Sequence, residues 1–132
     1  YAKAPSIDST AMGGEPATVL VVDDDPSLRL LCRVNLELEG YRVVEAESVE
    51  GARAVLDTES IDAILLDVHL GSDDGLGLLP AIEQDGPAVA LLTGSPGVLL
   101  PVGATVIGKP FSIDELSDTV RDLVGREGSS LG

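Results

Sequence analysis

The chain has 132 residues with 23 acidic and 8 basic side chains, which gives a formal net charge of −15. Such a charge argues against direct binding to nucleic acid or to an anionic membrane, because both require a basic face. Aromatic residues make up only 2% of the chain, so the core must be built from Leu, Val, Ile and Ala, as is usual in α/β sheets.

Residues 1–15 are rich in Ser, Pro, Gly and Ala, and they lack the apolar region of a signal peptide. We expect residues 1–16 to be a disordered leader or a cloning remnant, residues 17–125 to form one domain, and residues 126–132 to be a flexible tail. No apolar run approaches the roughly 20 residues that a membrane span requires. We therefore expect a cytoplasmic protein that does not bind membranes.

The first apolar run, residues 18–22, predicts a strand buried on both faces that stops at three consecutive carboxylates. Those carboxylates belong to Asp23, Asp24 and Asp25. A helix should follow, with Asp25 as its N-cap, Pro26 in its first turn and Gly40 at its end. Its inward positions are expected at helical spacing, at Leu28, Leu31, Cys32, Leu36 and Leu38, with Asn35 as a polar interruption.

The central strand is predicted at residues 61–67, where an apolar run leads directly into Asp67. Before it, residues 41–46 are expected to form a short strand, and Ser48 is expected to begin a second helix. The inward positions of that helix are Ala52, Val55 and Leu56. After the central strand, residues 71–75 have the composition of a loop.

A third helix is expected over residues 75–85, although Pro80 is unfavourable inside a helix. Its inward positions are Leu76, Leu79 and Ile82. Two further apolar runs predict strands over residues 88–93 and 104–107.

The last helix is predicted over residues 112–124 and opens with a capping box formed by Ser112 and Glu115. Its inward positions are Ile113, Leu116, Val120, Leu123 and Val124. Strands therefore alternate with helices along the chain, which predicts an α/β fold with a doubly wound parallel sheet.

Polar residues follow the carboxyl ends of the predicted strands, at residues 23–25, Asp67, Thr93 and Lys109. Because parallel strands end at one edge of a sheet, these side chains should meet there. Clustered carboxylates need a cation, and oxygen ligands of this kind suit Mg²⁺. A hydroxyl and an ammonium group opposite a carboxylate can hold a phosphoryl group, and aspartate is a known phosphoryl acceptor.

Four motifs together resemble the receiver domain of two-component response regulators, the CheY-like family. The motifs are Val-Val-Asp-Asp-Asp-Pro at residues 21–26, Leu-Leu-Asp at 65–67, Leu-Thr-Gly at 92–94 and Lys-Pro-Phe at 109–111. The resemblance covers residues 18–124 and implies a five-stranded parallel sheet with strand order 2-1-3-4-5. It also implies a cis peptide bond between Lys109 and Pro110.

By this resemblance, Asp67 accepts a phosphoryl group from a sensor histidine kinase, Thr93 hydrogen-bonds that group, and Lys109 pairs with it. The implied ligands of Mg²⁺ are the carboxylates of Asp23, Asp24 and Asp67 and the backbone carbonyl of His69, with Asp24 a more direct ligand than Asp23. The His69 side chain is expected to be exposed beside the site. Such a domain is a signalling module and not an enzyme, apart from its own phosphorylation and dephosphorylation.

The sequence departs from this family in two places on the usual output face. Val106 stands where receivers carry an aromatic residue that moves on phosphorylation. Residues 95–103 contain two prolines and two glycines, so the fourth helix of the family should be shortened or absent. In this the chain is similar to the LovR-type single-domain regulators. That similarity implies a partner-binding protein or a phosphate sink, with a downstream regulator protein as a second partner. A receiver cut from a larger protein is the other interpretation.

Two further interpretations of the site stay open. The Asp-x-Asp spacing at residues 23–25 also occurs in aspartate-nucleophile phosphohydrolases, in which Asp23 would be the nucleophile and Asp67 a bystander. Alternatively, the chain is a non-phosphorylated interaction module with a vestigial site. Phosphate labelling at Asp23 would favour the phosphohydrolase, and failure to bind Mg²⁺ would favour the interaction module.

Overall fold

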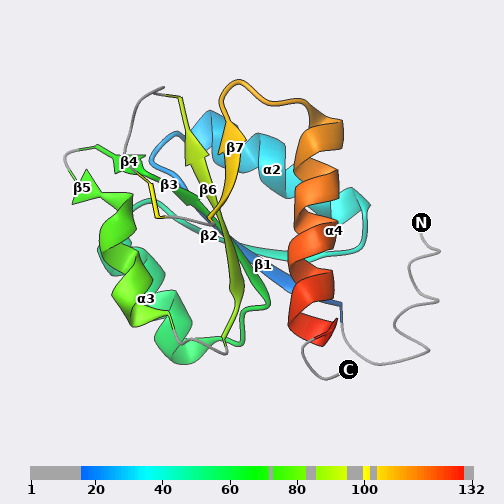
Figure 1. Ribbon diagram of the computed structural model, residues 1–132, viewed down its shortest axis with the longest axis horizontal. Helices are drawn as coiled ribbons and strands as arrows, with labels where there is room; N and C mark the ends of the chain where they lie inside the picture. Colours follow the sequence, from blue (N-terminus) through cyan, green and yellow to red (C-terminus); the bar gives the residue numbers. More distant parts are fainter. Residues whose placement is uncertain (1–15, 72, 83–85, 95–99, 102–103, 130–132) are drawn as a thin grey trace.

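The computed structural model describes residues 16–71, 73–82, 86–94, 100–101 and 104–129. It contains a five-stranded parallel sheet with helices on both faces (Figure 1). The strands of this sheet are β1 (Thr18–Val22), β2 (Arg42–Ala46), β3 (Ala63–Asp67), β6 (Ala88–Thr93) and β7 (Thr105–Gly108). Their spatial order is β2-β1-β3-β6-β7, which is the predicted order when the strands of the sheet are counted along the chain. The doubly wound α/β fold is therefore confirmed.

The helices divide between the two faces of the sheet (Figure 1). One face carries α2 (Pro26–Leu38) and α4 (Ile113–Ser129), and the other carries α3 (Val49–Thr58) and the 3-10 helix η1 (Gly75–Ala81). Each face covers its own apolar core, to which successive residues of a strand contribute in alternation. Within the part of the chain that is described, no helix is both long and apolar enough to cross a membrane.

Strands β1 and β3 occupy the middle of the sheet, and all five residues of each are buried. Val22 pairs with Leu66, and Leu92 of β6 pairs with Asp67. The central strands therefore end together, and Asp23, directly after β1, reaches the same edge as Asp67.

The predicted helix starts are present in the structure. The N-cap side chains are Asp25, Ser48 and Ser112. Each accepts a hydrogen bond of 2.9–3.0 Å from a backbone N–H in the first turn of its helix. The first helix is followed by Gly40, whose φ of 98° is readily adopted by glycine. These local signals predicted the starts of the three α-helices to within one residue.

Two of the predicted inward positions of α2 are wrong. Leu31 is 41% exposed and Leu38 is 80% exposed, and the neighbouring Leu30 and Val34 are exposed as well. The helix packs on the sheet through one narrow stripe, spaced by four residues, at Leu28, Cys32 and Leu36. The apolar pattern of the helix is wider than the surface that the sheet covers.

The third predicted helix differs in type and length. Residues 75–81 form the 3-10 helix η1 instead of an α-helix, and residues 83–85 lie outside the described part. Pro80 lies inside η1, and in an α-helix its ring would crowd the carbonyl four residues earlier and remove one hydrogen bond. The predicted inward residues Leu76, Leu79 and Ile82 are only partly buried, whereas Leu78, which was not predicted to point inward, is fully buried.

A short pair of antiparallel strands follows β3, and its second strand lies where a loop was predicted over residues 71–75. Strand β4 (His69–Leu70) pairs in antiparallel fashion with β5 (Asp73–Asp74). The last helix also differs from its prediction, since α4 continues past Val124 to Ser129. Its inner face is nevertheless the predicted one, with Leu116, Val120 and Leu123 fully buried.

The prediction of a shortened or absent fourth helix falls mostly outside the described residues. Between residues 95 and 103 only Leu100 and Pro101 are described, and neither belongs to a helix or strand. Leu100 packs against the core on the α3 side of the sheet. Residues 1–15 and 130–132 are likewise outside the described part, so the predicted domain boundaries stay predictions.

Candidate functional site

The carboxyl edge of the sheet brings three carboxylates together. One carboxylate oxygen from each of Asp23, Asp24 and Asp67 lies within 4.8 Å of the others. The first two residues follow β1, and the third ends β3. Because both strands are buried along their whole length, the first polar residues come at the strand ends. The third residue of the acidic run, Asp25, is not part of the cluster and caps α2 instead.

Asp23 is fully buried, and both of its carboxylate oxygens have partners. Oδ1 accepts a hydrogen bond of 2.9 Å from the N–H of Asp25, and Oδ2 pairs with Nζ of Lys109 at 2.9 Å. The backbone N–H of Asp23 donates to the carbonyl of Ala46. The Asp23 carboxylate is therefore held in place on both oxygens inside the protein.

Asp67 is 4% exposed. Its Oδ1 accepts a hydrogen bond of 3.0 Å from the N–H of His69, and its Oδ2 lies 3.4 Å from Nζ of Lys109. Burial, together with repulsion from Asp23, raises the pKa of Asp67 above its ordinary value, and the His69 N–H and Lys109 offset only part of this rise. The site therefore holds more negative charge than its surroundings stabilise, which favours binding of a cation.

Lys109 follows β7 and reaches across to the ends of the two central strands. Burial alone would lower the pKa of Lys109, but its hydrogen bonds and charge interactions with Asp23 and Asp67 outweigh burial, and the pKa is raised. The side chain is therefore charged at neutral pH. The backbone N–H of Lys109 donates to the carbonyl of Thr93 at 2.8 Å. The peptide bond between Lys109 and Pro110 is cis, as predicted.

Thr93 and His69 also lie at this edge. Thr93 ends β6, next to the strand that ends in Asp67, and it pairs with Gly108, the residue before Lys109. The side chain of His69 is exposed, as predicted, although it belongs to β4 and not to a loop. Its backbone N–H already contacts Asp67, so the main chain of His69 passes beside the carboxylate cluster.

The donor set of the cluster suits a hard divalent cation. Mg²⁺ prefers oxygen ligands at about 2.0–2.1 Å in an octahedral arrangement, which places neighbouring ligand atoms roughly 3 Å apart and opposite ones roughly 4 Å apart. Oxygens that already lie within 4.8 Å of one another meet this requirement after small movements. No cysteine or histidine side chain belongs to the cluster among the described residues, which disfavours a softer metal such as zinc.

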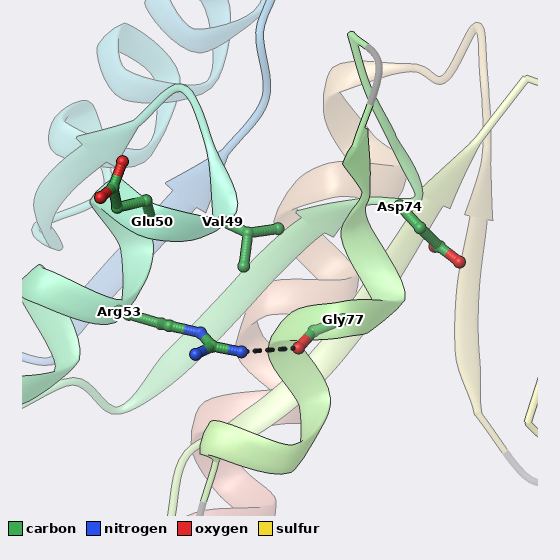
Figure 2. A pocket seen from close by; sticks show the side chains of 5 residues that line it. All are labelled: Val49, Glu50, Arg53, Asp74 and Gly77. Carbon is green, nitrogen blue, oxygen red and sulfur yellow. Dashed lines mark hydrogen bonds between the residues drawn. The ribbon is translucent and has the colours of Figure 1, made fainter.

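A groove of about 380 Å³ lies between α3 and η1 and shares no residue with the carboxylate cluster. Its lining residues are Val49, Glu50, Arg53, Asp74 and Gly77. Figure 2 shows the Arg53 guanidinium reaching across the groove, where it donates to the carbonyl of Gly77 at 3.4 Å. This groove therefore adds no substrate pocket to the cluster.

Two residues beside the cluster were not predicted from the sequence. Arg29 donates from Nη1 to the carbonyl of Asp23 at 2.6 Å. Gly75 lies against the main chain of Asp67, and a Cβ atom at this position would overlap the Asp67 carbonyl oxygen. An arginine on a helix and a glycine after an aspartate in a loop are both common, so neither residue gave a specific signal.

The matches to known proteins agree on one protein family. Residues 19–121 match the response regulator receiver domain family. The chain is 35% identical over 123 residues to the "Probable transcriptional regulatory protein TcrX" of Mycobacterium tuberculosis, and 38% identical over 122 residues to the transcriptional regulatory protein GlrR of Escherichia coli. These matches cover 87% and 86% of this chain but 53% and 27% of the two relatives, so the chain spans about half of their length or less.

Solved structures give the same match. The chemotaxis response regulator CheY4 of Vibrio cholerae is similar with a TM-score of 0.72 and 26% identity, over 82% of this chain and 98% of that one. NtrX of Brucella abortus is similar with a TM-score of 0.78 and 28% identity, over 87% of this chain and 28% of that one. The fold and the sequence motifs therefore point to the same family.

Proposed function

This chain belongs to the response regulator receiver domain family, and we propose that it accepts a phosphoryl group on Asp67 from a sensor histidine kinase. The observation that carries the proposal is the position of the Asp67 carboxylate. It lies within 4.8 Å of the carboxylates of Asp23 and Asp24, and 3.4 Å from the ammonium of Lys109. A nucleophile, a set of cation ligands and a fixed positive charge are the parts that phosphoryl transfer requires.

In the proposed reaction, a carboxylate oxygen of Asp67 attacks the phosphorus atom of a phosphohistidine on the kinase. The new P–O bond forms as the P–N bond breaks, and the histidine ring leaves with the bonding electron pair and takes up a proton. Lys109 would neutralise charge on the phosphoryl oxygens, and the hydroxyl of Thr93 would donate to one of them. The N–H of His69 holds the acceptor carboxylate in place during the attack.

We propose that the carboxylates of the cluster and the backbone carbonyl of His69 hold Mg²⁺. When bound, Mg²⁺ would neutralise the carboxylates and the negative charge of the transferring group. Asp24 is exposed and can turn toward the cation, whereas Asp23 is buried and engaged by Lys109. This difference supports Asp24 as the more direct ligand.

For the biological role, we propose partner binding or drainage of phosphate from a kinase, in the cytoplasm, with a downstream regulator protein as the second partner. Val106, in place of the usual aromatic residue, is 44% exposed on β7. It is too small to make the large movement of an aromatic ring. This supports an output that does not depend on that movement. The only chemistry proposed for the chain is its own phosphorylation and dephosphorylation.

The test of phosphorylation is the mass of the intact protein after incubation with Mg²⁺ and acetyl phosphate. We expect one phosphoryl adduct on the wild-type chain and none on Asp67→Asn. The matched control is Asp25→Asn, which changes an exposed carboxylate outside the cluster and should keep the adduct.

An adduct that survives Asp67→Asn and is lost in Asp23→Asn would support the phosphohydrolase instead. Absence of any adduct would contradict both, once a short lifetime has been excluded with the stable mimic beryllofluoride. Absence of Mg²⁺ binding would favour the non-phosphorylated interaction module.

A further inference from the structure

Arg29, in the second turn of α2, connects the helix to the acidic end of β1. Its Nη1 donates to the backbone carbonyl of Asp23 at 2.6 Å, and its Nε donates to Oε1 of Glu45 at 2.9 Å. The Arg29 side chain is only 15% exposed. A charged donor at this distance from a carbonyl makes a strong hydrogen bond, particularly where water has limited access.

The carbonyl that Arg29 holds belongs to the peptide unit between Asp23 and Asp24. Because this unit is planar, a fixed carbonyl also fixes the N–H of Asp24 and restricts the direction of the Asp24 side chain. On the other side of Asp23, its N–H donates to the carbonyl of Ala46 at 3.1 Å. The Asp24 side chain is exposed, so packing does little to orient it. The direction in which the Cα–Cβ bond of Asp24 leaves the backbone is set by the main chain that Arg29 holds.

Glu45 anchors Arg29 to the sheet. It lies in β2, where it pairs with Val21 of β1, and its Oε2 accepts a second bond of 2.9 Å from Nη1 of Arg33. Burial alone would raise the pKa of Glu45, but its hydrogen bonds to Arg33 and Arg29 outweigh burial and lower it. Glu45 is therefore ionised at neutral pH. Of its two arginine partners, Arg29 is the one that also contacts Asp23.

From these contacts we propose that Arg29 is a positioning residue, which fixes the peptide unit between Asp23 and Asp24 so that the Asp24 carboxylate faces the cation site. The inference rests on the proposed function, in which this cluster binds Mg²⁺. An arginine is required because its planar fork donates in two directions at once, from Nε to Glu45 and from Nη1 to the carbonyl. Lysine has a single nitrogen and can satisfy these two acceptors less well.

Charge and position predict opposite effects of removing Arg29. Its positive charge lies beside a cation site, so by Coulomb's law alone its removal should strengthen Mg²⁺ binding. If Arg29 instead orients Asp24, its removal should weaken Mg²⁺ binding, as is typical when a group that supports a metal ligand is lost. The sign of the change therefore separates a positioning role from a purely electrostatic one.

The experiment is a calorimetric titration of the metal-free protein with Mg²⁺ alone, for the wild type, Arg29→Ala, Arg29→Lys and Arg33→Ala. For Arg29→Ala we expect the Mg²⁺ dissociation constant to rise about tenfold or more. The Mg²⁺ dissociation constant of Arg29→Lys should lie between those of Arg29→Ala and the wild type. Arg33→Ala is the matched control, because it removes a Glu45 partner and one positive charge but leaves the Asp23 carbonyl bond intact. The affinity of Arg33→Ala for Mg²⁺ should equal that of the wild type or be slightly higher.

Circular dichroism first establishes that each variant is folded. If Arg29→Ala does not fold, the comparison is made with Arg29→Lys, which retains the apolar stem and should still bind Mg²⁺ more weakly than the wild type. An affinity for Mg²⁺ equal to or tighter than that of the wild type in a folded Arg29 variant would overturn the positioning role and leave the proposed function standing. Absence of Mg²⁺ binding by the wild type would overturn both, so the two failures are distinguishable.

Discussion

The ammonium group of Lys109 lies closer to Asp23 than to the proposed phosphoryl acceptor Asp67, at 2.9 Å against 3.4 Å. Lys109 and Asp23 are 86 positions apart in the chain. Asp23 is fully buried, so Lys109 supplies the charge that stabilises it. The same lysine is placed to meet a phosphoryl group on Asp67. This arrangement couples the stability of the site to its chemistry.

Replacing Lys109 with Met should destabilise the metal-free protein and tighten its binding of Mg²⁺. Loss of the partner of a buried carboxylate costs about 3 kcal/mol, while removal of a positive charge from the cluster favours a cation. Denaturant unfolding and Mg²⁺ titration measure the two effects. Arg42→Ala is the control, since it removes an exposed ion pair to Glu59 and should cost less than about 1 kcal/mol.

The stability supplied by Lys109 should also depend on pH. Its pKa in the folded protein is raised above the ordinary value of 10.5, so the folded state holds this proton more tightly than the unfolded state. The stabilisation is then complete below pH 10.5 and is lost as the pH rises through the folded value. The free energy of unfolding of Lys109→Met should therefore approach that of the wild type as the pH rises through this alkaline range. If the two free energies differ by the same amount at pH 7 and in the alkaline range, the charge of Lys109 is not the source of the stabilisation.

Asp67→Asn should stabilise the metal-free protein at pH 7, by about 1 kcal/mol or a few degrees in melting temperature. Burial and the nearby Asp23 raise the pKa of Asp67, so the folded state disfavours the charged carboxylate. For such a group, stability falls as the pH rises from the ordinary value of 3.8 through the folded pKa. The gain from Asp67→Asn should therefore shrink as the pH falls through this window. Thermal unfolding of both proteins without metal, at several pH values, measures this gain in stability. A lower melting temperature for Asp67→Asn than for the wild type at pH 7 would contradict the prediction.

Gly75→Ala should lower both stability and phosphorylation. The added Cβ would overlap the carbonyl oxygen of Asp67 and approach the main chain of Val68, and crowding of this kind costs about 1–3 kcal/mol. Gly77→Ala is the matched control in the same 3-10 helix, because its Cβ would meet no atom within 4 Å. Its stability should be unchanged or slightly higher. Similar melting temperatures for the two variants would show that the close approach at Gly75 is unimportant.

Cys32 should be unreactive in the folded protein. It is fully buried, and burial raises the pKa of its thiol to about 12, so very little thiolate exists at pH 8. Iodoacetamide at pH 8 should modify the chain to completion in denaturant and only slowly under native conditions. Intact mass against time measures both rates. Fast native modification would show that α2 separates from the sheet more readily than the packing of Cys32 implies.

The central part of the site could be predicted from the sequence because its causes are local. The apolar runs before Asp23 and Asp67 can be buried on both faces only as inner strands of a covered parallel sheet. Once they are inner strands, the carboxylates that follow them must meet at one edge. The caps at Asp25 and Ser112 could be predicted for a similar reason, since donor and acceptor lie within three residues of one another.

The predictions for α2 and η1 were partly wrong because a pattern within one segment does not show which elements pack against that segment. The apolar residues of α2 correctly indicated a helix and a buried Cys32, but they did not show that Leu31 and Leu38 would be left exposed. Pro80 indicated that a regular α-helix is unfavourable here, but it did not indicate that a 3-10 helix forms in its place. The extent of burial and the helix type depended on which elements lay opposite, and the pattern within one segment does not contain that information.

The order of the strands along the chain, the buried runs and the carboxylates that end them all follow from the amino-acid sequence, because each depends on residues that are close in the chain. The closer pairing of Lys109 with Asp23 than with Asp67 follows from the packed structure and could not be predicted from the sequence. The same holds for the bond from Arg29 to the Asp23 carbonyl, with Glu45 as the anchor of Arg29, and for the lack of room for a side chain at Gly75 beside Asp67. These contacts are fixed by the packing of whole elements against one another, since distances between side chains on different elements follow from that packing and from no pattern within a single segment.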